Sequence, residues 1–328
     1  MFLYSDVCEY KKSSISVCAV CSETLHKMNV TVIPFFLAAN VIVNDTSEWV
    51  FGPEYFYNLN LNTTYVNVPE NFSMPNEVRL FMTMKCRPKI PNRLLCLILN
   101  STYTDSYRGL LQSLTRTTSF PSFEIKYNKR GIESLLINST FVNANEGKFN
   151  VIKRIANQLN LGVNLKRNRD TSRFKGVENT SMGICTTRYE ISRNESETEP
   201  VKENIDFTLF VLPMTDAKPG TTVSIEKYRT RCINSPRRLY SRVLKMERFF
   251  SKMQIGDGFE SFSKLDGKLR TYLTHSNETF LLPFNDVMHL NLISIKPAQN
   301  DIPNIDSGKL YELNINTAPD QESYELYE

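Results

Sequence analysis

Short runs in which apolar and polar residues alternate recur through most of this 328-residue chain. The alternation is clearest over residues 55–68 and 77–85. A period of two residues is typical of a strand with one buried face. Further strands are expected at residues 30–43, 123–127, 132–142, 205–213, 218–228 with a Pro-Gly turn at its start, 268–274, 279–282 and 287–295, and residues 239–250 fit either a helix or a strand. Closely spaced strands with polar turns predict an all-β fold, a sandwich or barrel.

The central apolar run covers residues 94–99, between Pro91 and Asn100. It is too short for a lone helix, and it predicts a strand that is buried on both faces. A polar turn is expected over residues 100–106, after which the chain re-enters the core. Gly109 at the end of this turn would let the backbone approach another backbone or a ligand. The simplest interpretation is a hairpin between two core strands.

The pattern changes after residue 142. Apolar residues at a helical period predict a helix over residues 149–161. After this helix come a basic run at residues 166–175 and a polar, acidic run at residues 193–203, and such runs are typical of solvated linker segments. We therefore expect an N-terminal β-domain at 1–142, a linker with one helix at 143–199, a C-terminal β-domain at 200–297 and a mobile tail at 298–328.

Charge and composition narrow the classes of function. The net charge is +4, with a pI near 8.5, and the basic residues are scattered. This distribution argues against a nucleic-acid-binding protein. No window approaches 18 uncharged apolar residues, so no transmembrane helix is expected. We expect a monomer that binds neither nucleic acid nor a membrane.

Cysteines and glycosylation sequons point to opposite compartments. The seven cysteines, several of them inside apolar runs, predict reduced core thiols. A zinc site made by Cys8, Cys18, Cys21 and His26 is the alternative interpretation, and otherwise no metal site is expected. Nine Asn-x-Ser/Thr sequons are present, although the N-terminal residues lack the layout of a signal peptide. Because Asn100 and Asn138 each follow an apolar run, we expect unglycosylated protein.

The segment Asp-Ser-Tyr-Arg-Gly at residues 105–109 resembles the third motif of the trimeric dUTPase family. In that family an aspartate, a tyrosine and a glycine form the hairpin that binds uracil and deoxyribose. Tyr107 and Gly109 match this spacing, whereas Thr104 stands at the aspartate position and Asp105 follows one residue later. The resemblance implies that Tyr107 stacks under the sugar and that a carboxylate acts on the attacking water.

Further segments in the second half are similar to dUTPase motifs and follow the order of the family. Asp206 matches the aspartate of the first motif, and Arg242 is the retained residue of the phosphate-binding second motif. Residues 273–290 resemble the fourth motif, with His275 and His289 in place of an asparagine and a glutamine. The glycine-rich lid that forms the fifth motif has no counterpart in this sequence.

One motif in the first half, followed by three in the second, is the layout of herpesvirus dUTPases, which are double-length chains. The resemblance implies two dUTPase-like jelly-roll domains joined by the linker. Many members of this group have lost catalysis and serve as tegument, regulatory or host-interaction proteins. We therefore expect an inactive dUTPase-related protein in the host cytoplasm or nucleus, or in the virion tegument, that binds a host or viral protein.

The alternative function is hydrolysis of dUTP to dUMP and pyrophosphate, with Mg²⁺ held largely by the phosphates. An active enzyme would use Asp105, Asp206 and Tyr107 in catalysis. Tyr107, Gly109 and Arg242 would then contact the substrate. Because the motif-three aspartate, the phosphate-binding serines and the lid are displaced or missing, most of the transition-state stabilisation should be lost. We therefore expect no catalytic residue and no cofactor.

Overall fold

The structure is a computed structural model. It describes residues 26–32, 37–43, 45–69, 74–107, 114–128, 131–162, 173–180, 183–194, 207–211, 221–233, 243–256, 258–272, 279–301, 305 and 308–312.

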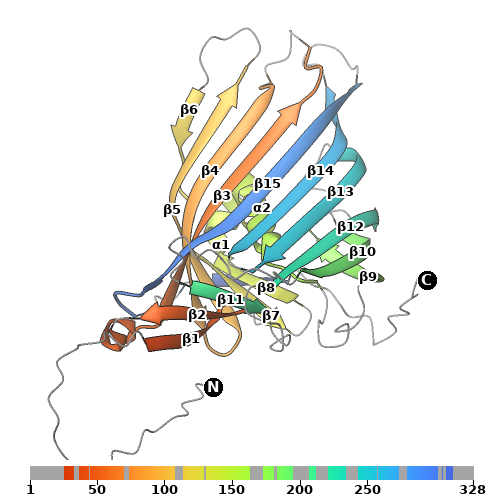
Figure 1. Cartoon of the computed structure of the whole chain (residues 1–328). Coiled ribbons are helices and arrows are strands. Elements are labelled where there is room, and N and C mark those ends of the chain that lie inside the picture. Colours follow the sequence, from red (N-terminus) through yellow and green to blue (C-terminus); the bar gives the residue numbers. More distant parts are fainter. Residues whose placement is uncertain are drawn as a thin grey trace, which may run out of the picture.

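One large antiparallel sheet of 13 strands dominates the described chain (Figure 1). Its strands are β3 (Pro53–Tyr65), β4 (Glu77–Lys89), β5 (Arg93–Ser106), β6 (Leu114–Thr117), β7 (Phe123–Asn128), β8 (Gly131–Asn138), β9 (Arg173–Thr180), β10 (Gly183–Asn194), β12 (Thr222–Ile233), β13 (Val243–Ile255), β14 (Phe259–Tyr272), β15 (Thr279–Pro297) and β16 (Gly308–Glu312). The order across the sheet is β16-β8-β7-β5-β4-β3-β15-β14-β13-β12-β10-β9, and β6 pairs with the upper part of β5. The prediction of an all-β fold is confirmed.

A smaller sheet has the order β1-β2-β11, from β1 (His26–Val32), β2 (Leu37–Val43) and β11 (Phe207–Val211). The remaining elements are the 3₁₀ helix η1 (Thr46–Trp49), α1 (Ser139–Ala144) and α2 (Glu146–Gln158). The helix predicted over residues 149–161 is thereby confirmed as α2, with its start three residues earlier.

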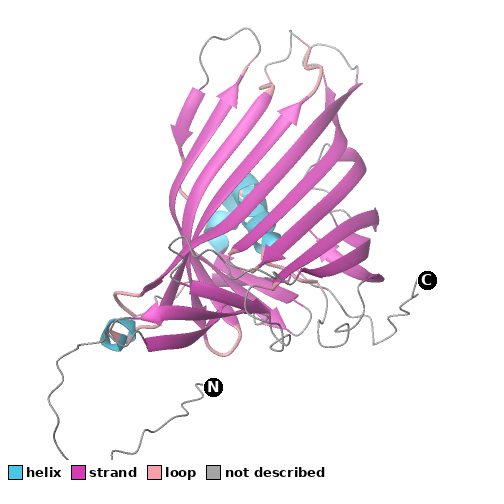
Figure 2. Cartoon of the chain, in the orientation of Figure 1, coloured by secondary structure: helices cyan, strands magenta, loops and turns pink. Residues whose placement is uncertain are grey.

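The large sheet curves around α1 and α2 (Figure 2). Ile152, Ile155 and Ala156 on one side of α2 are fully buried in the main core. Apolar residues three and four positions apart share one helix face, which explains why this side of α2 packs on the sheet. Burying an isoleucine side chain completely contributes about 1.5–3 kcal/mol to the free energy of folding, because its apolar surface is removed from water.

Each central strand has an inner face toward the helices and an outer face toward solvent. On β3, Tyr55, Tyr57 and Leu59 are buried, the intervening Phe56 and Asn58 are half-buried, and the following Asn60 is exposed. This is the alternation that the sequence predicts for a half-buried strand.

The polar turn predicted at residues 100–106 is wrong, because β5 continues through these residues to Ser106. The register between β5 and β4 shifts at one point: Met84 pairs with Ile98, and Thr83 pairs with Asn100. Leu99 is therefore the extra residue of a β-bulge. The prediction of a strand buried on both faces is also wrong, since 39% of Leu97 and 43% of Leu99 are exposed.

Two segments expected outside the domains contribute strands. Residues 143–199, predicted as a linker, contain β9 and β10 as well as α2. Within the predicted mobile tail, β16 pairs with β8 through residues 308–312. In β10 the residues alternate between buried and exposed or half-buried, which suits an edge region of the sheet despite the polar composition.

Strands from both predicted domains share the same sheet. β15, from the second predicted domain, pairs with β3, from the first, over the whole length of β3. The jelly-roll topology and the division into domains remain predictions.

The expectation of reduced thiols is wrong for four of the seven cysteines. Cys86 is bonded to Cys96, and Cys185 to Cys232. Each disulfide joins two neighbouring antiparallel strands, where the small separation of facing residues permits the bond. Cys8, Cys18 and Cys21, on which the zinc alternative depends, lie outside the described residues.

None of the helices in the described parts of the chain has the length and apolar character needed to cross a membrane.

Candidate functional site

Two of the five predicted site residues lie together at the upper end of β5. Asp105 is buried and Tyr107 is half-buried directly beyond the strand end. Since they are two residues apart in extended chain, both side chains belong to the same face of the strand. Gly109, Asp206 and Arg242 lie outside the described residues, so the structure does not test whether they join this group.

The surroundings of Asp105 are supplied by the chain itself. Arg116 on β6 approaches its carboxylate, with 3.4 Å between Nη2 and Oδ2. Burial raises the pKa of Tyr103 above its ordinary value, and the nearby Asp105 carboxyl raises it further. The neutral phenol of Tyr103 can therefore act as a hydrogen-bond donor toward the carboxylate. Asp105, Arg116 and the two tyrosines therefore form a small polar cluster at the C-terminal end of β5.

A second buried carboxylate lies in the same row of the inner face. The cross-strand register runs from Asp105 through Val78 and Thr63 to Asp286 on β15. Three strand spacings separate the two carboxylates, about 14 Å along the sheet. Asp286 accepts hydrogen bonds from Thr63 Oγ1 at 2.9 Å and from Arg154 Nη2 of α2. Asp286 thus ties the helix to the sheet.

A deeply buried charge cluster is formed by Glu178 on β9 with Lys227 and Arg229 on β12. Lys227 Nζ donates to Glu178 Oε1 at 2.9 Å and to the carbonyl oxygen of Asn160 at 2.6 Å. Arg229 Nε donates to Glu178 Oε2 at 2.7 Å, and its Nη1 donates to Ser251 Oγ at 2.8 Å. Each of the three charged side chains is at most 4% exposed.

The electrostatics of this cluster follow from two cations facing one carboxylate. Burial raises the pKa of Glu178, but Arg229 and Lys227 outweigh it and leave the pKa below its ordinary value. Burial also lowers the pKa of Lys227 to about 8, with Arg229 adding to the effect and Glu178 opposing it. Glu178 is therefore held as a carboxylate at neutral pH by its two partners.

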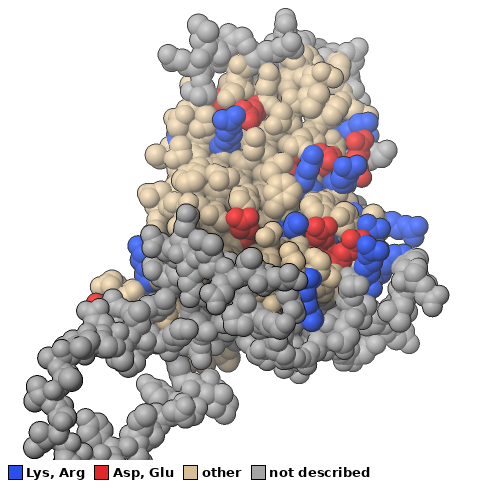
Figure 3. All heavy atoms as spheres, viewed as in Figure 1, with Lys and Arg blue, Asp and Glu red and all other residues tan. Residues whose placement is uncertain are grey.

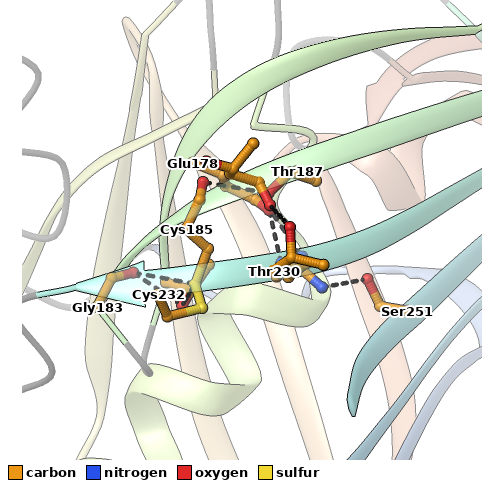
Figure 4. The surroundings of a disulfide bond; sticks show 10 residues. Glu178, Gly183, Cys185, Thr187, Thr230, Cys232 and Ser251 are labelled. Atoms are coloured by element: carbon orange, nitrogen blue, oxygen red, sulfur yellow. Dashed lines mark hydrogen bonds and ion pairs between the residues drawn. A yellow bond between two sulfur atoms is a disulfide. The ribbon is translucent and has the colours of Figure 1, made fainter. Parts of the chain in front are cut away.

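A disulfide lies beside this cluster (Figure 4). Cys185 and Thr187 occupy the same phase of β10, and Thr187 Oγ1 donates to Glu178 Oε2 at 3.4 Å. Cys232 follows three residues after Arg229 on β12. The covalent bond therefore joins β12, which carries Lys227 and Arg229, to β10, which lies between β12 and β9.

Aromatic side chains form a ladder on the outer face of β12, β13 and β14. Tyr228 faces Phe250 in the register, with a distance of 4.9 Å between ring centroids, and Phe250 and Phe262 are 6.4 Å apart. The guanidinium of Arg188 lies 4.7 Å from the centre of the Tyr228 ring, as in a cation–π contact. We call Arg188, Tyr228, Phe250 and Phe262 the aromatic ladder.

Opposite charges surround the aromatic ladder. Lys252 Nζ is 3.2 Å from Glu226 Oε1, and Tyr228 Oη donates to Glu226 Oε2 at 2.8 Å. His289, predicted as a counterpart of a dUTPase motif, lies here opposite Phe262, with its Nε2 3.8 Å from Glu260 Oε2. In the view of Figure 3, acidic and basic side chains lie beside one another toward the edge where Figure 1 places β12 and β13.

Sequence reasoning missed the aromatic ladder and the buried charges. Part of the signal for both was present in residues 223–229, where apolar and polar residues alternate up to Glu226. Lys227 and Arg229 share the phase of Val223 and Ile225, which are buried, and Tyr228 has the opposite phase. Their partners, Glu178 on β9 and Phe250 and Ser251 on β13, lie far along the chain and could not be predicted from the local pattern.

Comparisons with known proteins identify no family. No family model matches this chain. No curated protein matches it either. A lipovitellin structure described as showing lipid–protein interactions has a TM-score of 0.49 and 13% identity, covering 78% of this chain and 27% of its own. The binding domain of botulinum neurotoxin DC, in complex with rat synaptotagmin II, has a TM-score of 0.11 and 8% identity, covering 80% of this chain and 87% of its own. This chain thus spans about a quarter of the lipovitellin chain.

Proposed function

We propose that this chain is a non-catalytic β-sheet scaffold, related to the herpesvirus dUTPases, that binds a host or viral protein. The aromatic ladder on the outer face is the proposed binding surface. Aromatic residues and arginine are the residue types enriched at protein interfaces and at their energetic hot spots. The ladder places three aromatic rings and Arg188 on adjacent strands, within a rim of paired charges.

The buried carboxylates support the non-catalytic part of the proposal. Asp105 lies against Arg116, Asp286 against Arg154, and Glu178 against two cations. A carboxylate that acts on a substrate water must be able to reach it. Glu178 and Asp286 are engaged by cations of the same fold, as expected for structural ion pairs, whereas Asp105 contacts Arg116 at 3.4 Å through Oδ2 and its buried Oδ1 has no hydrogen-bond partner.

Binding is tested by comparing two variants of the full chain in a pull-down from infected cells with quantitative mass spectrometry. Tyr228→Ser combined with Arg188→Ser removes the outer part of the ladder. Phe81→Ser is the matched control, because Phe81 is an aromatic residue on the same face of β4 and is 43% exposed. We expect the ladder variant to lose a specific partner by at least about tenfold, and the control to retain it.

That same partner, added as purified protein, should bind the wild-type chain and the Phe81→Ser variant with equal affinity. Equal recovery of every protein by the ladder variant would refute the proposed surface. Thermal unfolding of both variants shows that the fold is intact.

The enzymatic alternative rests on the placement of Asp105 and Tyr107 on one face of the β5 end. Release of pyrophosphate from dUTP in the presence of Mg²⁺ tests it, with Tyr107→Ala as the comparison. We expect no turnover by either protein. Turnover that requires Tyr107 would restore the dUTPase function, with Asp105 or Asp206 as the residue that activates water.

A further inference from the structure

One glycosylation sequon begins at Asn100, within strand β5. Asn100, Ser101 and Thr102 are consecutive residues of β5. Asn100 is exposed, Ser101 is buried on the inner face, and Thr102 is half-buried on the outer face. The amide of Asn100 therefore points to the convex side of the sheet, where a bulky group has room.

The β-bulge at Leu99 gives Asn100 this orientation. Ile98 points to the inner face and is 8% exposed. In a regular strand Asn100 would share the phase of Ile98 and point into the core. The extra residue in the bulge reverses the phase, so that Leu99 and Asn100 both lie outside. The sequence-based objection to a glycan at Asn100 assumed a buried position, and the structure removes it.

The surface around Asn100 is partly apolar. Leu97 and Leu99 precede Asn100 on the same strand, and Phe81 lies opposite Thr102 on β4. These three side chains are 39%, 43% and 43% exposed, respectively. A sugar attached to Asn100 would shield this apolar surface from other molecules. It would stand several strands away from the aromatic ladder.

Other described sequons are less suitable. The Nδ2 of Asn62, the atom that would carry the sugar, donates to Glu77 Oε1 at 2.9 Å. Asn138 is half-buried, and its Oδ1 accepts from the backbone amide of Thr140 at 2.9 Å, which caps α1. Among these three fully described sequons, Asn100 alone has an exposed side chain.

The disulfides supply an independent observation about the compartment. Disulfides persist in oxidising environments such as the endoplasmic reticulum, where N-linked glycans are also attached. Formation of the two bonds requires the four thiols to give up four protons and four electrons to disulfide-exchange partners in that compartment. The same environment thus accounts for both the cross-links and an exposed sequon.

We propose that the chain folds in the secretory pathway and carries an N-linked glycan on Asn100. In the transfer, Asn100 Nδ2 forms a bond to the anomeric carbon of a lipid-diphosphate-linked oligosaccharide. The bond from that carbon to the diphosphate oxygen breaks, the lipid diphosphate leaves, and the amide loses one proton. A host oligosaccharyltransferase catalyses this step. The site and compartment are independent of the proposed binding function.

The test uses the full chain expressed in mammalian cells. Peptide N-glycosidase converts a glycan-bearing asparagine to aspartate, which peptide mass spectrometry detects. We expect conversion at Asn100 and a glycosidase-sensitive shift in electrophoretic mobility. In the Asn100→Gln and Thr102→Ala variants, the mobility shift on glycosidase treatment should each time be smaller by the amount that one glycan contributes. Thr102→Ser preserves the sequon and should retain the full shift, as should Asn60→Gln, an exposed outer-face asparagine outside any sequon.

Alkylation under non-reducing conditions tests the compartment on the same samples. Cys86 and Cys96 should resist alkylation until a reductant is added. An unmodified Asn100 peptide would overturn the proposal, whether or not other sequons are occupied. Free thiols at Cys86 and Cys96 in protein from cells would overturn its compartment.

Discussion

Lys227 and Arg229 occupy positions of β12 that alternate with the outer face, in the same phase as two buried apolar residues. Cations in that phase must enter the core with a partner, because an isolated buried charge is strongly unfavourable. Glu178 supplies the negative charge from β9, and Ser251 and Asn160 accept further hydrogen bonds. The strand pattern thus predicts buried cations, but it cannot identify their partner.

At this residue scale, we expect Glu178→Gln to be strongly destabilising. The substitution keeps the shape of the side chain and leaves two buried cations without a carboxylate. Breaking a buried ion pair in this way costs about 3–5 kcal/mol. Glu190→Gln is the control, since Glu190 pairs with the largely exposed Arg188, and it should cost less than about 1 kcal/mol. Urea unfolding of the two variants measures the difference. Similar losses of stability would show that Glu178 does not stabilise the fold by neutralising Lys227 and Arg229.

The pKa of Lys227 gives this cluster a second readout. Since the folded pKa is about 8 and the ordinary value is 10.5, the unfolded chain binds more protons between these values. The contribution of Lys227 to the free energy of unfolding should therefore rise with pH across that window. In a Lys227→Met variant this contribution disappears, so the wild type should gain stability relative to the variant from pH 8 to pH 10. A constant difference would contradict the lowered pKa.

At the scale of elements, most of the individual strands could be predicted from alternation, because a half-buried strand needs only its own residues to show its period. The errors have local physical causes. The bulge at Leu99 reversed the phase within β5, so polar residues after it resembled a turn. β9 and β16 are short and contain few apolar residues, and β10 and β8 supply their hydrogen-bond partners. The site residues were predicted less well. Asp105 and Tyr107 could be selected from the local sequence, whereas the role of Glu178 depends on partners from β12, a strand distant along the chain.

The disulfides permit a prediction about pairs of strands. Cys86 and Cys96 are 10 residues apart, whereas Cys185 and Cys232 are 47 apart. In the chain-entropy description, a longer closed loop restricts the unfolded chain more, giving about 2.7 and about 4 kcal/mol respectively. We expect the Cys185→Ala/Cys232→Ala variant to lose about 1 kcal/mol more stability than Cys86→Ala/Cys96→Ala.

Guanidinium unfolding without reductant compares these two double variants with the wild type. Both pairs contain buried sulfur, so the loss of packing partly cancels in the comparison. The opposite order of stability would mean that native packing, rather than the loop length, controls the effect.

At the scale of the whole molecule, long-range pairing decides the architecture. Residues of β3 pair with residues of β15 that lie more than 200 positions later, as in the hydrogen bond from Thr63 to Asp286 with a separation of 223. No local pattern specifies that register, because many strands have the same period and apolar phase. This is why the sequence predicts strands well but divides them into two domains, while the structure joins them in one sheet.

We expect the two predicted domains to unfold as one cooperative unit. Separating them would remove the hydrogen bonds between β3 and β15 and expose the buried inner residues Leu59 and Leu290, which face each other in the register. Trp49 is the single tryptophan, and it packs against the core near the start of β3. Its fluorescence reports on the first half of the chain, whereas hydrogen exchange of the β12–β14 amides reports on the second. The two probes should give the same unfolding midpoint, and a fragment of residues 200–297 should show no protected amides. Two separate transitions, or a folded fragment, would establish the two-domain division instead, because a cooperative sheet cannot lose its central strand pairing and keep half of its strands protected.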